Sequence, residues 1–126
     1  MKEAIATEKA PAALGPYSQA VKTDGLVFTS GQLGIVPSTG ELVSDDVADQ
    51  VAQVIDNLEA VLAEDGLTLA DVVKTTVYLR SMGDFAAMNA VYAERFPAPF
   101  PARSAVEVGP LAKNALVEIE AVAVRR

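Results

Sequence analysis

Two kinds of residue in the second half of the sequence could bind and transform a small organic acid. Arg103 stands at the start of the apolar segment ARSAVEV, directly after the proline-rich stretch FPAPFP. Glu118 and Glu120 alternate with apolar residues in LVEIEAVAV. A guanidinium grips a carboxylate through charge-assisted hydrogen bonds, and a partly buried glutamate can accept a proton near neutral pH. These residue types predict a carboxylate site beside a group that activates water.

Each of these residues also has a simpler interpretation. Arg103 could form an ion pair with Glu107 or with a glutamate of the last strand, or it could lie in solvent. Glu118 and Glu120 could both point to solvent as charges of an edge strand. The prolines before Arg103 favour the binding role, because they would hold its approach stiffly. Spacing alone does not choose between Glu118 and Glu120.

Four further residues are weaker candidates. Ser30 and Gly31, in SGQLG, follow an apolar strand, and the glycine would let a backbone amide approach a carboxylate, although such a stretch is usually only a turn. SGQLG is not a phosphate-binding loop, because no lysine follows and no helix is expected there. Tyr17 in GPYSQ is more often a packing ring, and Asn89 is more often a surface residue of a helix.

The composition limits the chemistry and the partners. The 126 residues fit one domain, residues 1–126, and include no His and no Cys, which excludes a Ser-His-Asp triad, a cysteine nucleophile and the common zinc sites. The net charge of −7 makes binding to nucleic acid or to anionic membranes unexpected. We expect a cytoplasmic protein, because no apolar run approaches the roughly 20 residues of a membrane span and MKEAIATEKAP lacks the apolar core of a signal peptide.

The elements that would position these residues follow from periodicity and turn signals. Apolar residues at helical spacing from Val47 to Leu62 predict a helix that Ser44 or Asp45 caps and Gly66 ends. A second helix should begin at Asp84 and end at Pro97. Strands are expected at residues 3–6, 18–23, 26–30, 72–80, 102–108 and 116–124, with a type I′ turn at Asp24-Gly25.

This order of elements predicts an α+β sheet with both helices on one face. The last strand has one wholly apolar face that can lie under the helices, formed by Val117, Ile119, Ala121 and Ala123. Its other face carries Glu118 and Glu120 followed by valines, and a monomer would leave that face uncovered. An uncovered, partly apolar sheet face predicts oligomerisation.

Six segments together resemble the Rid family of reactive intermediate deaminases, also called the YjgF family. They are APAALGPYSQAV, VFTSGQLG, DVVKTTVYL, FAAMNAVYAERF, FPARSAVEV and LVEIEAVAV, and they follow in the family's order over about residues 5–126. The resemblance implies a chorismate-mutase-like α+β fold, in which two helices pack on one face of a mixed β-sheet. It also implies a homotrimer with clefts between the subunits.

The resemblance further implies an activity and the residues that carry it. The reaction would be hydrolysis of 2-imino acids and their enamine tautomers, such as 2-iminopropanoate and 2-iminobutanoate, to a 2-keto acid and ammonia, with no metal or organic cofactor. Arg103 would hold the substrate carboxylate, and Glu118 would position or activate the water. Substrate-binding positions of the family fall on Arg103, Tyr17, Ser30, Gly31, Asn89 and Ala105.

Ala105 is a departure from the family pattern, because many active members have cysteine two residues after the arginine. A mechanism that required this thiol would fail here, but we expect activity to survive through Arg103 and Glu118. Two other activities are described among the relatives: deamination of 3-aminoacrylate in pyrimidine breakdown, and translation inhibition, RNA cleavage or chaperone-like action. The net charge of −7 and the lack of His count against an RNase.

Overall fold

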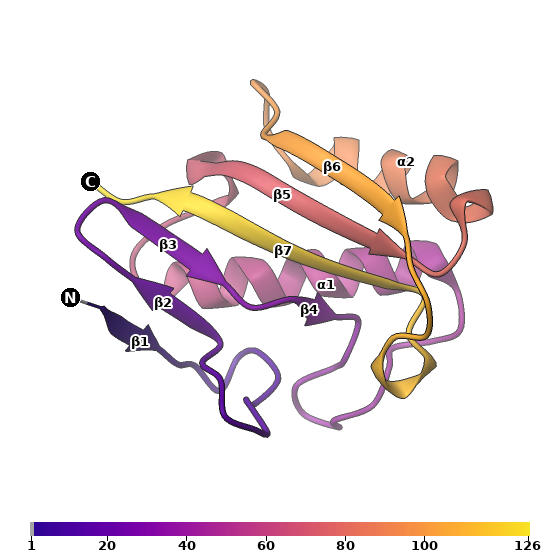
Figure 1. The fold of residues 1–126 in the computed structure, drawn as a ribbon, viewed down its shortest axis with the longest axis horizontal. Coiled ribbons are helices and arrows are strands. Elements are labelled where there is room, and N and C mark those ends of the chain that lie inside the picture. Colours follow the sequence, from indigo (N-terminus) through magenta and orange to yellow (C-terminus); the bar gives the residue numbers. More distant parts are fainter. Residues whose placement is uncertain (1) are drawn as a thin grey trace.

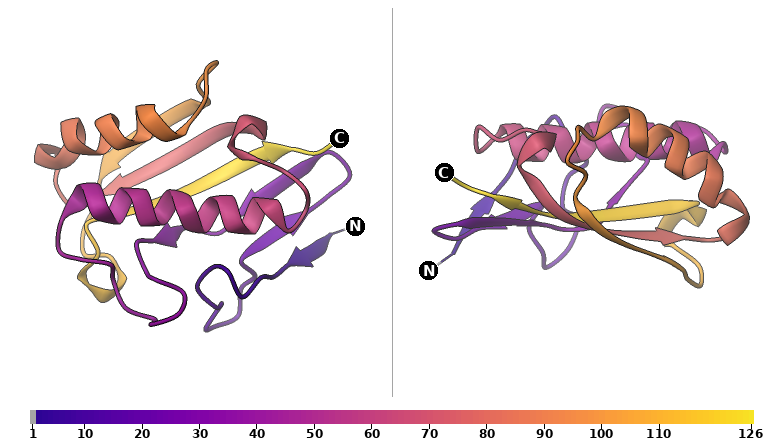
Figure 2. Two further views of the ribbon diagram at one scale, coloured as in Figure 1. Left: turned by 180° about the vertical axis from the view of Figure 1, so that it is seen from behind. Right: turned by 90° about the horizontal axis from the view of Figure 1, so that it is seen from above.

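A mixed sheet of seven strands carries both long helices on one of its faces (Figures 1 and 2). This computed structural model describes residues 2–126. The elements are β1 (Glu3–Ile5), β2 (Ala20–Lys22), β3 (Leu26–Thr29), β4 (Gln32–Leu33), α1 (Val47–Ala63), β5 (Val72–Leu79), α2 (Phe85–Arg95), β6 (Ala102–Glu107) and β7 (Val117–Val124). The strand order is β1-β2-β3-β7-β5-β6, and β4 also pairs with β7. Within residues 2–126 no helix is long and apolar enough to cross a membrane.

The expected α+β architecture is confirmed, and so is every expected strand and helix, with ends that differ by one or two residues. Strands β5 and β6 pair in parallel, whereas β7 is antiparallel to β3, β4 and β5. The expected loop after residue 30 contains β4, which was missed because two residues carry no periodic signal. All seven residues of the α1 stripe are buried: Val47, Val51, Val54, Ile55, Leu58, Val61 and Leu62.

The start of α1 differs from the expectation. The cap is Asp46, whose carboxylate accepts a hydrogen bond from the Asp49 backbone amide at 3.0 Å, and not Ser44 or Asp45. The Ser44 hydroxyl instead accepts from the Asp46 backbone amide and donates to the Asp49 carboxylate. It therefore lies before the helix and stabilises the positions of Asp46 and Asp49. Gly66, expected to end the helix, lies three residues beyond Ala63 with a left-handed φ of 73°.

Two local expectations need correction. The β2–β3 hairpin is present, but neither Asp24 nor Gly25 has a positive φ, so the turn is not type I′. The Gly25 carbonyl accepts from the Arg125 backbone amide at 2.9 Å, so a contact with the end of β7 shapes this turn. Asp84 does precede α2, but its side chain makes no capping hydrogen bond because a 3₁₀ turn, Met82–Asp84, leads directly into the helix.

The two faces of β7 separate as the alternation predicted. Val117, Ile119, Ala121 and Ala123 are buried beneath the helices. The other face of the sheet has no helix over it, as the right-hand view of Figure 2 shows. Three large apolar side chains remain exposed there: Phe28 at 45%, Val106 at 43% and Val124 at 40%. We call this surface the open face.

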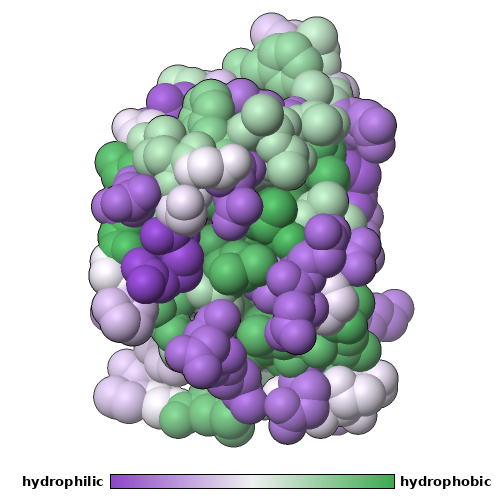
Figure 3. Space-filling view, turned by 90° about the vertical axis from the view of Figure 1, so that its right-hand side faces the viewer, coloured by the Kyte–Doolittle hydropathy of each residue, from purple (hydrophilic) through white to green (hydrophobic). Residues whose placement is uncertain are grey.

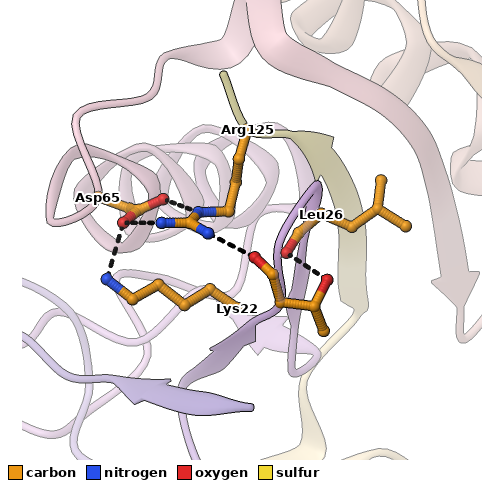
Figure 4. Close-up of polar contacts among 5 residues, drawn as sticks. Lys22, Leu26, Asp65 and Arg125 are labelled. Atoms are coloured by element: carbon orange, nitrogen blue, oxygen red, sulfur yellow. Dashed lines mark hydrogen bonds and ion pairs between the residues drawn. The ribbon is translucent and has the colours of Figure 1, made fainter. Parts of the chain in front are cut away.

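An ion cluster fastens the end of β7 to the rest of the chain (Figure 4). Asp65, just after α1, accepts from Arg125 Nε at 2.7 Å and from Lys22 Nζ of β2 at 3.0 Å. Arg125 also donates to the Thr23 carbonyl. The hydrogen bond from Arg125 lowers the pKa of Asp65, and Lys22 lowers it further. We call Lys22, Asp65 and Arg125 the C-terminal clamp.

Candidate functional site

The Arg103 side chain lies on the helix side of the sheet, in a cradle formed by α2. Arg103 is opposite the buried Thr75 of β5, which sets its direction. Its guanidinium carbon lies 4.8 Å from the ring centre of Tyr92 and 5.5 Å from that of Phe85. Arg103 Nη1 donates to Asn89 Oδ1 at 2.6 Å. Cation–π contact and one amide therefore hold a half-buried cation in place.

Arg103 has no carboxylate partner among residues 2–126 within the 4.0 Å of an ion pair. The alternatives in which it pairs with Glu107 or with a glutamate of the last strand are wrong. Glu107 instead accepts from the Met82 backbone amide at 2.9 Å. A hollow of about 500 Å³ lies beside the guanidinium, with walls formed by Asn89, Tyr92, Ala93, Phe100, Pro101 and Arg103. An uncompensated cation in a partly apolar wall is suited to a small anion.

Glu118 lies on the open face, where β7 is flanked by β4 and β5. It stands opposite Leu33 on one side and Tyr78 on the other. A Cβ atom added to Gly31 would fall 1.9 Å from Glu118 Oε2, so only glycine leaves room for this carboxylate. Burial raises the pKa of Glu118, and the charge of Glu120 raises it further. Such a carboxyl is suited to take up a proton near neutral pH.

Glu118 lines one hollow, and its neighbours Gly31 and Leu33 line a second. One, of about 310 Å³, is lined by Tyr78, Glu118, Glu120 and residues 108–111. The other, of about 340 Å³, is lined by Tyr17, Gly31 and Leu33 among others. Figure 3 looks at the end of the molecule where β5 and β6 finish and β7 begins, and it shows apolar surface exposed between hydrophilic side chains.

Ser30 and Tyr17 belong to the same neighbourhood as Gly31. The Ser30 hydroxyl donates to the Ser18 carbonyl at 2.6 Å, which anchors the loop that carries Tyr17. Tyr17 is 55% exposed and is therefore not the packing ring that its simpler interpretation suggested. Beneath this region the buried Asn57 of α1 donates to the carbonyls of Leu33 and Ile35, at 3.0 and 2.9 Å, and so fixes β4 beside Glu118.

The predicted site residues thus form two groups that the chain does not bring together. The arginine group is Arg103, Asn89 and Ala105, on the helix side of the sheet. The glutamate group is Glu118, Gly31, Ser30 and Tyr17, on the open face. In the strand register Arg103 is level with Ala121, which is three residues, or about 10 Å, along β7 from Glu118. One chain cannot present both charges to one small molecule.

Several residues of these groups were not found from the sequence. The rings of Phe85 and Tyr92, both on the second helix, lie against the Arg103 guanidinium, and the helical pattern of residues 84–97 does not reveal this contact. The sequence indicates Tyr78 only as part of the strand at residues 72–80, whereas its hydroxyl donates to Glu120 Oε1 at 2.8 Å. The alternation along the strand predicts that Tyr78 and Val77 point to opposite faces of the sheet. It does not predict the strand pairing that places Tyr78 opposite Glu118.

The chain matches the model of the family described as Endoribonuclease L-PSP over residues 7–125. It belongs to the Rid, or YjgF, family. Among Rid relatives, it is 54% identical to a RutC family protein of Pyrococcus horikoshii, over 98% of each chain. It is 50% identical to the 2-iminobutanoate/2-iminopropanoate deaminase of Escherichia coli strain K12, over the full length of both.

Solved structures agree with the Rid assignment: RidA from the Antarctic bacterium Psychrobacter sp. PAMC 21119 superposes with a TM-score of 0.94 at 45% identity, covering 98% of this chain and 99% of that one. The crystal structure of E. coli TdcF with bound serine superposes with a TM-score of 0.93 at 42% identity, covering 98% of this chain and 99% of that one. Within this Rid chain Ala105 is half-buried opposite Val77 and packs against the core. No thiol is therefore available two residues after Arg103.

Proposed function

We propose that this Rid chain is a hydrolytic deaminase of reactive 2-imino acids and their enamine tautomers, such as 2-iminopropanoate and 2-iminobutanoate. The products are a 2-keto acid and ammonia. One observation carries the proposal: Arg103 keeps a positive charge that no carboxylate of residues 2–126 neutralises, as a site for a substrate carboxylate requires. The name of the E. coli relative, at 50% identity over its full length, supports the same substrate class.

The site that performs this reaction is shared between two subunits of a homotrimer. The positions of the two groups on opposite faces of the sheet support this arrangement, because Arg103 of one copy can meet Glu118 only in another copy. The exposed Phe28 and Val106 on the open face, and Phe100 at 56% exposure beside the Arg103 hollow, supply apolar surface for the contact. A contact between two different surfaces closes into a ring when its rotation permits, and a trimer is such a ring.

Substrate binding sets the geometry for the chemical step. Arg103 holds the substrate carboxylate through paired hydrogen bonds, and the Gly31 backbone of the neighbouring subunit approaches the same group. This places C2 of the imino acid close to Glu118 of that neighbour. Imino acids already hydrolyse in water, so placement alone supplies much of the acceleration.

Glu118 then moves protons. It takes a proton from water as the water oxygen forms a bond to C2 and the C=N electron pair moves to nitrogen, and it then gives this proton to that nitrogen, which leaves Glu118 ionised again. The resulting intermediate has a hydroxyl and an amine on C2. Its C–N bond breaks as the hydroxyl oxygen forms the carbonyl, and the proton from that hydroxyl passes through Glu118 to the leaving ammonia. No step uses the position of Ala105, so the missing thiol does not interrupt the sequence.

A coupled assay tests this function. A serine or threonine dehydratase generates the imino acid, and 2-keto acid release is followed with and without the protein. The protein should accelerate release, and Arg103→Ala or Glu118→Gln should return it to the rate without protein. An unchanged rate with the wild-type protein, or full activity of Arg103→Ala, would refute the proposal.

The two other activities of the family are tested alongside. Turnover of 3-aminoacrylate should be slower than that of 2-iminobutanoate. Nuclease-free protein should leave RNA intact, and RNA cleavage that survives removal of both Arg103 and Glu118 would indicate contamination. Light scattering should give three times the 13.2 kDa chain mass, and a monomer at micromolar concentration would contradict the shared site. The cytoplasmic location expected from the sequence stays a prediction.

A further inference from the structure

Glu120 is a second carboxylate beside Glu118 that the mechanism does not use. The two lie on the same face of β7, with Tyr78 opposite Glu118 and Thr76 opposite Glu120 on β5. The Tyr78 hydroxyl reaches diagonally across the strands and donates to Glu120 Oε1 at 2.8 Å. Glu118, Glu120 and Tyr78 line the same hollow of about 310 Å³ together with residues 108–111, whereas Thr76 does not.

Among residues 2–126, no cation lies within the 4.0 Å of an ion pair from Glu118 or Glu120. Two cations lie on or just after β5: Lys74, whose Nζ donates to the Thr75 carbonyl at 3.1 Å and to Thr76 Oγ1 at 3.4 Å, and Arg80, whose Nη1 donates to the Val108 carbonyl at 2.6 Å. In the loop before β7, Lys113 lies 3.9 Å from Glu41. Near Glu118 the open face carries uncharged residues on both sides: Gly31 just before β4 and Leu33 on it, and Ser104 and Val106 on β6. Glu118 therefore has one charged neighbour in its own hollow, and that neighbour is also an anion.

We propose that Glu120, held by the Tyr78 hydroxyl, is a positioning residue whose charge sets the pH range in which Glu118 accepts a proton. This inference rests on the proposed function, because it assigns a partner to the proposed base. In the trimer the neighbouring subunit's Arg103 approaches Glu118 and would favour its ionised form. Glu120 opposes that effect, so Glu118 keeps its affinity for protons.

The electrostatics of the chain agree with this role. Burial raises the pKa of Glu118, and the carboxylate of Glu120 is the second cause that raises it. The pKa of Tyr78 is also raised, first by its hydrogen bond to Glu120, so Tyr78 stays protonated and donates at any pH where the reaction runs. Without the charge of Glu120, Glu118 would lose its proton at lower pH and would be a weaker base.

The test is the pH dependence of kcat/KM for 2-iminobutanoate, generated in situ by an excess of dehydratase. In Glu120→Gln the acid limb should move to lower pH, so that the activity at pH 5 relative to pH 8 rises about threefold or more. Glu120→Asp keeps the charge and should hold this ratio within about twofold of wild type. Glu94→Gln is the matched control, because it removes one exposed carboxylate from α2 and should leave the profile unchanged.

Tyr78→Phe tests the positioning. It keeps the ring but frees Glu120 to swing into solvent, so it should move the acid limb in the same direction by a smaller amount. If Glu120→Gln does not assemble, Tyr78→Phe carries the test alone. An unshifted profile in Tyr78→Phe would overturn the role of its hydroxyl.

The outcomes separate this inference from the function on which it rests. An unshifted profile in assembled Glu120→Gln, together with lost activity in Glu118→Gln, would overturn the inference and leave the deaminase intact. Full activity in Glu118→Gln would overturn the assignment of the base itself. If the acid limb shifts equally in Glu120→Gln and in Glu94→Gln, the shift is an effect of net charge, and this result would count against the inference.

Discussion

Two arginines of this chain, Arg125 and Arg103, are held in opposite ways. Arg125 donates to the Asp65 carboxylate at 2.7 Å within the C-terminal clamp, so its charge is neutralised inside the chain (Figure 4). Arg103 donates to a neutral amide, Asn89, and lies against two aromatic rings. The first arrangement fastens two elements, whereas the second fixes a guanidinium and leaves its charge available. The difference indicates a structural role for Arg125 and supports the binding role that we propose for Arg103.

Two carboxylates, Asp65 and Glu118, differ in the same way as the two arginines: among the described residues the first is paired with cations and the second is not. Asp65 accepts from two cations, and these lower its pKa. Glu118 forms no ion pair with a cation of residues 2–126, and burial with a neighbouring anion raises its pKa. An acid that is satisfied internally is stable as an anion at neutral pH, whereas an unsatisfied one is suited to take up a proton. Arg103, a cation without an ion-pair partner among residues 2–126, and Glu118, an acid without one, therefore lie on opposite faces of the sheet.

Removing each of the two arginines in turn should give the largest effects, and the two effects should differ in kind. Arg103→Ala should lower kcat/KM about 100-fold to 1000-fold, because two charge-assisted hydrogen bonds to the substrate are lost, while Tm changes little. Arg125→Ala should do the reverse, with a lower Tm and nearly unchanged kcat/KM. Steady-state kinetics and thermal unfolding of both variants check this. Equal loss of activity in both would contradict the division of roles.

Displacing the Glu118 carboxylate should have the next largest effect on activity. In Gly31→Ala the new Cβ would lie 1.9 Å from Glu118 Oε2, so the carboxylate must shift. We expect kcat to fall about 10-fold to 100-fold, since a displacement of about 1 Å in a catalytic group has effects of this size. Gly25→Ala is the control, because nothing lies within 4 Å of its added Cβ. Wild-type kcat in Gly31→Ala would show that the position of Glu118 is unimportant.

Asn89→Asp would make Arg103 resemble Arg125. A carboxylate at the 2.6 Å contact would neutralise the guanidinium, and KM for the imino acid should rise about tenfold with Tm equal or slightly higher. Asn89→Ala keeps the charge of Arg103 and should raise KM less. The same KM in Asn89→Asp as in the wild type would mean that the charge of Arg103 does not bind the substrate.

The smallest effect concerns the clamp alone. Asp65→Asn should lower Tm by about 3–6 °C, or about 1 kcal/mol after solvent screening, with unchanged kcat/KM. Because the folded-state pKa of Asp65 lies below the ordinary 3.8, its contribution is present above that pH and is lost as pH falls through the folded value. Denaturant unfolding of both proteins should therefore show a stability difference that closes below about pH 4. A difference that does not narrow as the pH falls below 3.8 would contradict the ionic origin.

The sequence was a good guide to the elements and to their faces. Alternation in β7 predicted which residues lie under the helices, and the α1 stripe was identified in full, because burial imposes these periods directly. It was a poor guide to what depends on contacts between distant segments. The β2–β3 turn is shaped by Arg125, which lies about a hundred residues away in the chain.

The same limit applies to the site. Arg103 and Glu118 could be selected by residue type and by family motif, but their separation across the sheet depends on the register of β5, β6 and β7. The partners of Arg103 were similarly hidden, because an aromatic residue at helical spacing has the same pattern whether it contacts the core or a guanidinium.

Mixing two inactive variants tests most directly whether the site is shared between subunits. Trimers formed from equal amounts of Arg103→Ala and Glu118→Gln chains would contain some contacts that join an intact Arg103 to an intact Glu118 of the neighbour. Random assembly gives about one quarter of the wild-type activity, although each variant alone has almost none. If mass spectrometry shows mixed trimers and their activity stays at the level of either variant alone, the shared site is wrong.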